Sequence, residues 1–279
     1  MTSNAHPPLP AIRDVVARAL AEDVLPLGDL TASLVPAGTA ARARLVSRQA
    51  GVLAGRLSAE ETFRQVDPTI EHRWNHDDGD VLEPGTVVAF VSGPLPSILT
   101  AERTALNLLG HLSGIATLTR AYADALHPVR LRDTRKTTPG LRSLEKAAVR
   151  AGGGLNHRAN LSDGILVKDN HIGGLSITRL TDLSKERWPG RTVEVECDTI
   201  EQVREALAAG ADMVLLDNMT PDDVRVAVKE VSGRVPVEVS GGITLGTAAA
   251  YATTGADFAA VGAITHSAPV LDIGLDLET

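Results

Sequence analysis

The pattern of apolar and polar positions divides the chain into two parts. In the first part, residues 11–21 carry apolar side chains at helical spacing behind a proline-rich lead, and a second helical run lies near residues 58–66. Short extended segments separated by Gly, Pro and Asp lie on either side of that run, namely ARLVS, TIEHRW and VVAFV. The first part therefore predicts a small α+β unit.

A longer helical pattern extends over residues 99–126 and contains two glycines. Gly110 and Gly114 are expected either to pack closely against another segment or to break the helix. Beyond this pattern the spacing of apolar residues changes to that of alternating strands and helices. We therefore predict a domain boundary near Gly110.

Six strand-like runs follow the boundary and alternate with helical runs: VRLRD, ILVK, VEVE, MVLLD, VEVS and FAAVG. This spacing predicts parallel strands with crossover helices, and six strands favour an incomplete barrel because a regular one has eight. The final segment, LDIGLDL, alternates apolar and polar residues and is expected to return to the first unit as a strand. The predicted domains are residues 1–110 joined by 270–279, and residues 111–269.

Polar side chains interrupt four of these strands at their C-terminal ends: Lys168, Glu196, Asp217 and Ser240. In a parallel α/β barrel the C-terminal ends of the strands meet at one rim, which carries the active site. A buried charge at this rim is costly without a partner, which a ligand or a metal would supply. The alternative is that Lys168 only pairs with Glu196 or Asp217 and closes that end of the barrel.

The same rim offers groups for a metal and for phosphate. Glu196 and Asp217 suit a Mg²⁺ ion, which proteins hold through one or two carboxylates, water and substrate phosphates. Two glycine-containing loops, VSGGIT and VGAIT, follow consecutive late strands and could present backbone N–H groups to an anion. A Gly-Gly pair after a strand is more often only a tight turn, so the pairing of the two loops carries this prediction.

Charge is distributed unevenly along the chain. The net charge of −8 argues against non-specific binding of nucleic acid, yet residues 130–168 hold nine Arg or Lys against three Asp or Glu. Arginine and lysine at such density suit carboxylates and phosphates, and we expect a focused site for a small polyanion. The side chains that would form its basic side are Arg135, Lys136, His157, Arg158, Lys168 and His171.

Cysteine content and the N-terminus bear on location. The single cysteine, Cys197, excludes an internal disulfide framework and a cysteine-based zinc cluster. The N-terminal residues lack the features of a secretion signal, and no apolar run approaches the length that spans a bilayer. We therefore expect a cytoplasmic protein without a membrane partner.

Several motifs together resemble the quinolinate phosphoribosyltransferase family. The segments are AERTALNLLGHLSGIAT, DTRKTTPGLR, GGGLNHRANLSDGILVKDNHI, VEVECDT, VLLDNM and VSGGIT, and the similarity covers nearly the whole chain. The resemblance implies an incomplete α/β barrel with a smaller N-terminal open α/β sandwich that includes the C-terminal strand. It also implies a homodimer or an assembly of dimers, in which the neighbouring N-terminal domain covers the active site.

The resemblance further implies a reaction: transfer of phosphoribose from 5-phosphoribosyl 1-pyrophosphate to quinolinate with decarboxylation. The products would be nicotinate mononucleotide, pyrophosphate and CO₂, in NAD biosynthesis, with Mg²⁺ as cofactor. Three other functions stay open at this point. They are a related enzyme without the carboxylating reaction (one that uses nicotinate, or a molybdenum-associated paralogue), a Schiff-base aldolase using Lys168, and a non-catalytic sensor of a phosphate ligand.

The family motifs assign expected roles to individual residues. Lys136, Lys168, Glu196 and Asp217 would be catalytic, and Glu196 is preferred to Glu194 by the motif and because strand alternation is taken to point these two side chains to opposite faces. Quinolinate would be bound by Arg103 of a neighbouring subunit, Arg135, His157, Arg158 and Lys168. Phosphoribosyl pyrophosphate would be bound by Lys136, Glu196, Asp217, Ser240, Gly241, Gly242, Gly262, Ala263, Ile264 and His266.

Overall fold

The computed structural model describes residues 6–36, 38–168 and 174–278. The chain divides into two compact units, each described here by itself. The first contains residues 1–120, 137–153 and 263–279, and the second contains residues 121–136 and 154–262. None of the helices in the described ranges is long and apolar enough to cross a membrane.

The first unit is built on an antiparallel sheet with the strand order β12-β1-β5-β3. Its strands are β1 (Ala40–Ser47), β3 (Glu71–Trp74), β5 (Val87–Pro94) and β12 (Ile273–Leu277). The C-terminal strand β12 pairs with β1, with Leu275 opposite Leu45, as the alternation in LDIGLDL predicts. Strands β2 (Gly51–Val52) and β4 (Val81–Leu82) form a separate pair.

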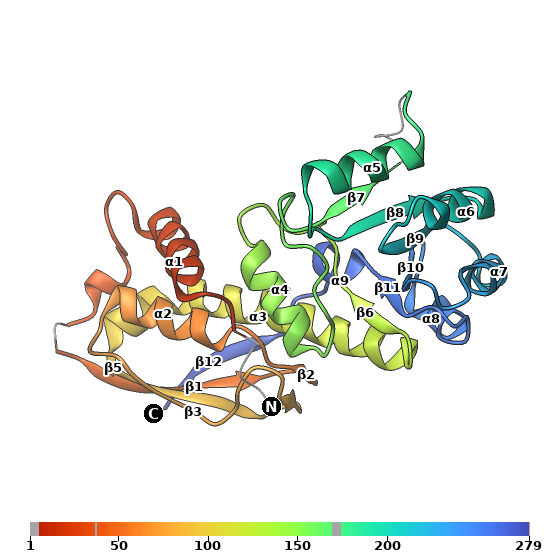
Figure 1. Ribbon diagram of the computed structural model, residues 1–279. Coiled ribbons are helices and arrows are strands. Elements are labelled where there is room, and N and C mark those ends of the chain that lie inside the picture. The colour runs from red at the N-terminus through yellow and green to blue at the C-terminus, as the bar shows by residue number, and fades with distance from the viewer. Residues whose placement is uncertain (1–5, 37, 169–173, 279) are drawn as a thin grey trace. The chain divides into compact units, whose positions relative to one another are not determined.

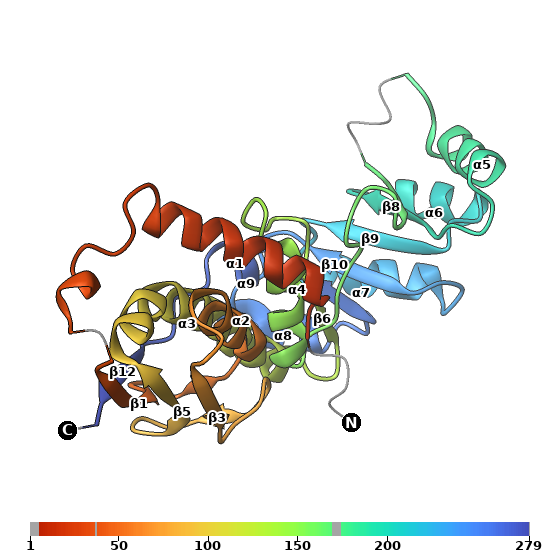
Figure 2. The same cartoon turned by 90° about the vertical axis from the view of Figure 1, so that its left-hand side faces the viewer.

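Helices cover one face of this sheet. Figures 1 and 2 both show α2 (Arg56–Val66) and α3 (Leu95–Leu126) on the same side of it. Phe63 of α2, Ile98 and Leu109 of α3, and Leu45 of β1 belong to one buried apolar cluster. Helix α1 (Leu9–Val24) reaches α2 through Gln65, whose amide donates to the carbonyl of Arg13. The unit also contains a short 3-10 helix (Ala32–Leu34), α4 (Arg142–Ala151) and α9 (Ala263–His266).

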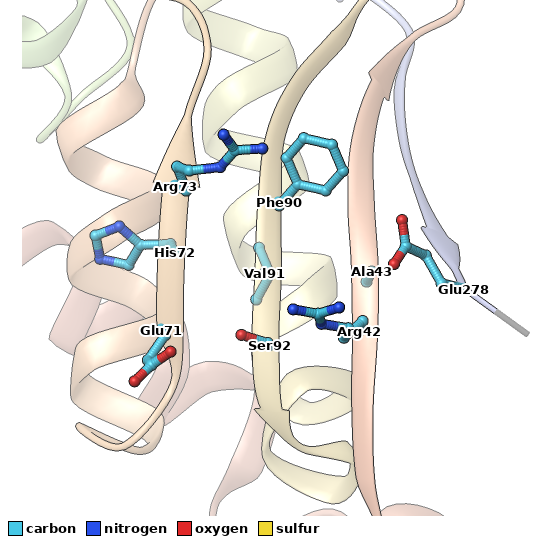
Figure 3. A pocket seen from close by; sticks show the side chains of 9 residues that line it. All are labelled: Arg42, Ala43, Glu71, His72, Arg73, Phe90, Val91, Ser92 and Glu278. Atoms are coloured by element: carbon cyan, nitrogen blue, oxygen red, sulfur yellow. The ribbon is translucent and has the colours of Figure 1, made fainter.

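The other face of the sheet is polar and open. Arg42, Ser92 and Glu71 are register partners on three neighbouring strands, so their side chains share this face. Arg73 lies over the ring of Phe90, 4.8 Å from its centre. Figure 3 shows these side chains around a pocket of about 530 Å³.

The two glycines of α3 are close-packing points and not breaks, because the helix is continuous from Leu95 to Leu126. A Cβ atom at Gly114 would lie 2.0 Å from the carbonyl oxygen of Pro269, and one at Gly110 would lie 2.8 Å from that of Leu271. The backbone of Leu271 donates to the carbonyl of Gly110 at 3.0 Å. The domain boundary predicted near Gly110 lies inside this helix. The predicted limits of the two domains also differ from those of the two compact units, and they stay a prediction.

The second unit contains a six-stranded parallel sheet with the order β6-β11-β10-β9-β8-β7. All six predicted strands are present, and the sheet is barrel-like without closing, because β6 and β7 form its two edges. The strands are β6 (Arg130–Arg132), β7 (Ile165–Val167), β8 (Val193–Cys197), β9 (Met213–Asp217), β10 (Val237–Ser240) and β11 (Phe258–Ala260).

A helix follows each of four consecutive strands of this sheet (Figure 1). These helices are α5 (Ile177–Arg187), α6 (Ile200–Ala208), α7 (Pro221–Val231) and α8 (Leu245–Ala252). Thr199 and Thr220 begin α6 and α7 with reciprocal capping hydrogen bonds, which satisfy the first free backbone N–H groups of each helix. Because the strands are parallel, their C-terminal ends lie at one edge of the sheet, where the loops to these helices begin.

Candidate active site

A cavity of about 370 Å³ opens at the C-terminal ends of the strands in the second unit. It brings together Lys168, Glu196, Asp217 and Ser240, the four strand-end residues that the sequence pattern singles out. The full lining is Thr134, Arg135, Lys136, His157, Arg158, Leu166, Lys168, Glu196, Leu215, Asp217, Ser240 and Ala260. All of these lining residues belong to the second unit.

The register of the parallel strands explains why these side chains meet. Ser240 of β10 lies directly opposite Asp217 of β9, and Cys197 of β8 lies opposite Leu216 of β9. Side chains two apart on one strand share a face, so Leu215 and Asp217 both point into the cavity. The strand ends thus place carboxylate and hydroxyl groups side by side.

Lys168 forms an ion pair with Glu196. This is the pairing that the alternative interpretation of the strand-end charges describes. It does not close the barrel end, because the cavity remains beside the pair and both residues line it. Lys168 and Glu196 are therefore available to groups that enter the cavity, at the cost of separating them.

Asp217 is held by its neighbour in the chain. The side-chain amide of Asn218 donates to Oδ2 of Asp217 at 2.6 Å, and the backbone N–H of Asn218 donates to the carbonyl of Ser240 at 2.9 Å. A Cβ atom at Gly241, whose φ is +87°, would lie 2.2 Å from Oδ1 of Asn218. Glycine is therefore required at this position for the loop after β10 to approach Asn218 so closely.

Three further basic side chains line the cavity: Arg135 and Lys136 from the loop after β6, and Arg158 from the segment before β7. Burial lowers the pKa of Arg158, and the positive charge of Arg135 lowers it further, while Glu194 opposes both effects. Two guanidinium groups thus lie close enough to repel each other. An anion bound between them would relieve this repulsion.

A layer of charged residues lies on the interior face of the sheet, one step below the strand ends. Glu194 contacts His157, and Glu238 forms an ion pair with Arg132. Glu194 and Glu238 are both buried, and burial together with the charge of Glu194 raises the pKa of Glu238 to about 7. Such a layer is unusual, since barrel interiors are mostly filled by branched apolar side chains.

The expectation that Glu194 and Glu196 point to opposite faces is wrong. Both lie on the face of the sheet where His157 lies: Glu194 accepts a hydrogen bond from the His157 ring, and Glu196 and His157 line the same cavity. The physical reason is that successive residues of a strand alternate, so residues two apart return to the same face. Val193, Val195 and Cys197 occupy the opposite face and are fully buried.

The remaining predicted residues are placed as follows. Gly242 has a φ of +63°, and a Cβ atom there would meet no atom within 4 Å, so there is room beside its backbone. Gly262 ends the second unit, and helix α8 begins at Leu245, three residues after Gly242. Arg103, Ala263, Ile264 and His266 belong to the first unit, and His171 lies outside the described residues.

Sequence reasoning missed the buried layer of Arg132, Glu194 and Glu238, and also Asp133, which is fully buried. The signal that could have found Glu194 and Glu238 is their spacing. Each lies two positions before a residue that was singled out, Glu196 or Ser240, and so shares its face. The apolar lining residues Leu166, Leu215 and Ala260 carry no comparable signal.

Both parts of the chain match the sequence model of a known family. Residues 29–113 match the quinolinate phosphoribosyl transferase N-terminal domain, and residues 115–276 match the C-terminal domain. The chain belongs to the quinolinate phosphoribosyltransferase family. As a family member it resembles the Mycobacterium leprae nicotinate-nucleotide pyrophosphorylase [carboxylating], with 44% identity over 278 residues that cover 96% of this chain and 97% of the relative.

Two further relatives agree. The probable nicotinate-nucleotide pyrophosphorylase [carboxylating] of Bacillus subtilis is 43% identical over 254 residues, which cover 90% of this chain and 88% of the relative. The solved structure of the nicotinate-nucleotide pyrophosphorylase from Francisella tularensis superposes with a TM-score of 0.94, at 38% identity and 99% coverage of both chains. The resemblance seen in the motifs is thus confirmed over both parts of this phosphoribosyltransferase.

Proposed function

We propose that this quinolinate phosphoribosyltransferase transfers phosphoribose from 5-phosphoribosyl 1-pyrophosphate to quinolinate in the cavity at the strand ends. Loss of CO₂ then gives nicotinate mononucleotide, with pyrophosphate as the other product, a step of NAD biosynthesis. The observation that carries the proposal is the composition of the cavity lining. Cations from Arg135, Lys136 and Arg158 line the same cavity as the carboxylates of Glu196 and Asp217.

Quinolinate fits the basic side chains of the lining because it carries two carboxylates on adjacent ring carbons. Arg135 and Arg158 repel each other, so a dicarboxylate between them is favoured by both charges at once. Lys168 adds a third cation when it leaves Glu196. A monocarboxylate such as nicotinate would neutralise fewer of these groups, and this favours quinolinate over the non-carboxylating alternative.

Phosphoribosyl pyrophosphate is assigned to the two carboxylates of the lining and to the loop after β10. Glu196 and Asp217 would accept from the ribose hydroxyls, Lys136 would bind the pyrophosphate, and Ser240 with Gly241 and Gly242 would bind the 5-phosphate. The open space beside Gly242 supports close approach of a phosphate to this backbone. The contribution of Gly262, Ala263, Ile264 and His266 to that phosphate site stays a prediction.

The residues also fit a magnesium ion. Glu196 and Asp217 supply two carboxylates from adjacent strands to one cavity, and Mg²⁺ is commonly held by one or two carboxylates while substrate phosphates and water complete its coordination. When bound, the ion would neutralise charge on the departing pyrophosphate. Magnesium is therefore part of the proposal, with Glu196 and Asp217 as the residues that hold it.

The residues of the cavity can support the reaction without covalent chemistry. Arg135, Arg158 and Lys168 would hold quinolinate so that its ring nitrogen forms a bond to C1 of the ribose as the bond from C1 to the pyrophosphate oxygen breaks. Glu196 would offset the positive charge that develops on the sugar ring. When the adjacent carboxylate departs as CO₂, its bonding electron pair stays on the ring carbon as a carbanion, which the neighbouring positive nitrogen stabilises and which then takes up a proton.

A second copy of the chain is expected to complete the site. Arg103 lies exposed on α3, in a different compact unit from the cavity, and the family resemblance implies that it reaches quinolinate from the neighbouring subunit of a homodimer. The dimer, the role of Arg103 and the cytoplasmic location stay proposals. Sedimentation of the full chain with and without substrates would measure the assembly.

The proposed function is tested by product analysis and by two variants. The enzyme with Mg²⁺, phosphoribosyl pyrophosphate and carboxyl-labelled quinolinate is expected to release equal amounts of labelled CO₂ and pyrophosphate. Arg135→Ala and Lys168→Ala should each lower kcat/KM for quinolinate by about a hundredfold, because a hydrogen bond to a charged group contributes roughly 1.5–3 kcal/mol.

The control is Arg179→Ala, which removes an exposed arginine from α5 in the same unit and should leave kcat/KM unchanged. Circular dichroism checks that each variant is folded. Turnover of nicotinate without CO₂ release would favour the non-carboxylating alternative. Binding of phosphoribosyl pyrophosphate without pyrophosphate release would favour the sensor. Normal activity in both cavity variants would refute the assignment of this cavity.

A further inference from the structure

The imidazole of His157 is engaged at both ring nitrogens. The backbone N–H of Arg158 donates to Nδ1 at 2.7 Å, and Nε2 lies 2.9 Å from Oε2 of Glu194. Because a backbone amide can only donate, Nδ1 must present a lone pair, and the ring proton therefore lies on Nε2 and points at Glu194. The ring is a neutral imidazole held in one tautomer.

The backbone of the same segment is held from the other side. Asp133, which follows β6 and is fully buried, accepts a hydrogen bond from the backbone N–H of His157 at 2.8 Å through Oδ1. Its Oδ2 accepts from the side-chain amide of Asn156 at 2.7 Å. The segment 156–158 is thus fixed to the end of β6 through its backbone and to β8 through the His157 ring.

Arg158 is the residue that this arrangement directs. Its backbone N–H is the donor to the His157 ring, and its Nη1 donates to the carbonyl of Gly164 at 3.0 Å. Arg158 lines the cavity, whereas Glu194 is not among the residues that line it. The hydrogen-bonded link from Glu194 to a ligand in the cavity therefore runs through His157 and Arg158.

The buried layer supports Glu194 in this position. Glu238 lies beside it with one oxygen 3.8 Å from Nε2 of His157, and its other oxygen is paired with Arg132. The ligand atoms of His157, Glu194 and Glu238 lie within 4.8 Å of one another, which would suit a cation by distance alone. The Nε2 proton engages one oxygen of Glu194 and Arg132 engages one oxygen of Glu238, while the other oxygen of each carboxylate is buried without a hydrogen-bond partner among the described residues. Because Nε2 carries a proton and Nδ1 accepts from Arg158, neither ring nitrogen has a lone pair left for a metal, so the geometry favours a structural clamp.

We propose that Glu194 is a positioning residue for quinolinate: it fixes the tautomer and direction of the His157 ring and through it the direction of Arg158. His157 then contributes no positive charge to the substrate. The inference rests on the proposed function, because it takes Arg158 as a group that binds a carboxylate of quinolinate. It replaces the expected role of His157 as a direct cationic ligand by a role in orientation.

Kinetics of two Glu194 variants test the inference. Glu194→Ala removes the acceptor for the His157 proton and is expected to raise the KM for quinolinate about tenfold, which corresponds to roughly 1.4 kcal/mol. The KM for phosphoribosyl pyrophosphate should stay within about twofold of the wild type. Glu194→Gln keeps an oxygen acceptor at the same place and should restore most of the quinolinate KM.

Asp212→Ala is the matched control for loss of stability. The Asp212 carboxylate accepts a hydrogen bond at 2.8 Å from the backbone N–H of Val193, at the N-terminal end of β8 and next to Glu194 in the chain. This variant should lower the unfolding midpoint while leaving the KM for quinolinate unchanged. If Asp212→Ala and Glu194→Ala changed the quinolinate KM equally, the role of Glu194 would be structural only and the inference would be overturned.

Nitrogen-15 NMR of histidine-labelled wild-type enzyme tests the tautomer directly, with the His157 signals assigned by their loss in His157→Gln. We expect a protonated Nε2 and an unprotonated Nδ1, both with and without quinolinate. A doubly protonated ring in the quinolinate complex would overturn the inference. Wild-type enzyme that releases no CO₂ would refute the proposed function instead, whereas active enzyme with unchanged kinetics in Glu194→Ala would refute this inference alone.

Discussion

The ammonium group of Lys168 forms an ion pair with the carboxylate of Glu196 between the ends of the neighbouring strands β7 and β8. In the proposed reaction these two residues serve different substrates, since Lys168 binds a carboxylate of quinolinate and Glu196 faces the ribose. The pair therefore has to separate when both substrates are bound. Glu196 thus competes with quinolinate for Lys168, and a variant of Glu196 can measure this competition.

Glu196→Gln should strengthen quinolinate binding while it slows turnover. Without the carboxylate, Glu196 no longer competes with the substrate for Lys168, and the dissociation constant should fall roughly twofold to fivefold, since a partly exposed pair contributes less than about 1 kcal/mol. The turnover number should fall about a hundredfold because the charge on the sugar ring is no longer offset. Titration calorimetry and pyrophosphate release measure the two effects.

Glu201→Gln makes the same change of charge on the exposed first turn of α6 and should alter neither quantity. Weaker quinolinate binding by Glu196→Gln would show that the carboxylate helps to orient Lys168 and does not compete with the substrate for it.

Stability should depend on pH through Glu238. Its pKa is raised from 4.5 to about 7 by burial and by Glu194, while the charge of Arg132 opposes the shift. A raised pKa in the folded state means that the folded protein holds this proton more tightly than the unfolded chain does. The contribution of Glu238 to stability is therefore complete below pH 4.5 and is lost as the pH rises to about 7.

Glu238→Gln should remove this dependence, because the amide resembles the protonated acid and can still accept from Arg132. The free energy of unfolding of the wild type should fall relative to that of the variant by about 1.4 kcal/mol per pH unit between the two pKa values. Urea unfolding at a series of pH values measures the difference. Parallel curves for the two proteins would contradict the prediction.

Gly114→Ala should be severely destabilising. The added methyl group would lie 2.0 Å from the carbonyl oxygen of Pro269, and neither the helix nor the backbone of the C-terminal segment can move without losing contacts. We expect a loss of at least about 2 kcal/mol in the free energy of unfolding, in the range found for overpacked interiors. Denaturant unfolding of the variant checks this.

Gly246→Ala is the matched control, since it adds a methyl group to α8 where the nearest atom would be 3.8 Å away. Alanine is favoured over glycine in helices, so this variant should be up to about 1 kcal/mol more stable than the wild type. Equal effects of the two substitutions would show that the close approach of Gly114 to Pro269 is not what requires glycine there.

The six parallel strands could be predicted because short strand-like runs alternate with helical runs at a regular spacing, which indicates parallel strands joined by crossover helices. The polar residues that end them, such as Glu196 and Asp217, could be assigned to one rim for the same reason. The alternation of the last segment predicted a strand there, and this strand is β12. These features depend on neighbours in the sequence.

The buried layer could not be assigned in this way. Glu238 and Glu194 look like ordinary polar positions within short strands, and their environment depends on Arg132 and His157, which come from distant segments. Likewise, the sequence left open whether Gly114 breaks the helix, because the atom that decides this belongs to Pro269. Pairings between distant segments leave no local pattern.

Local pattern and motif thus determined the strands, the strand-end residues and the family, because periodicity and turn chemistry act over a few residues. Only the tertiary structure decided that Lys168 pairs with Glu196, that Glu194 shares the face of Glu196, and that both nitrogens of His157 are engaged. These relationships arise from the register of strands that meet in space, and register is set by packing across the sheet.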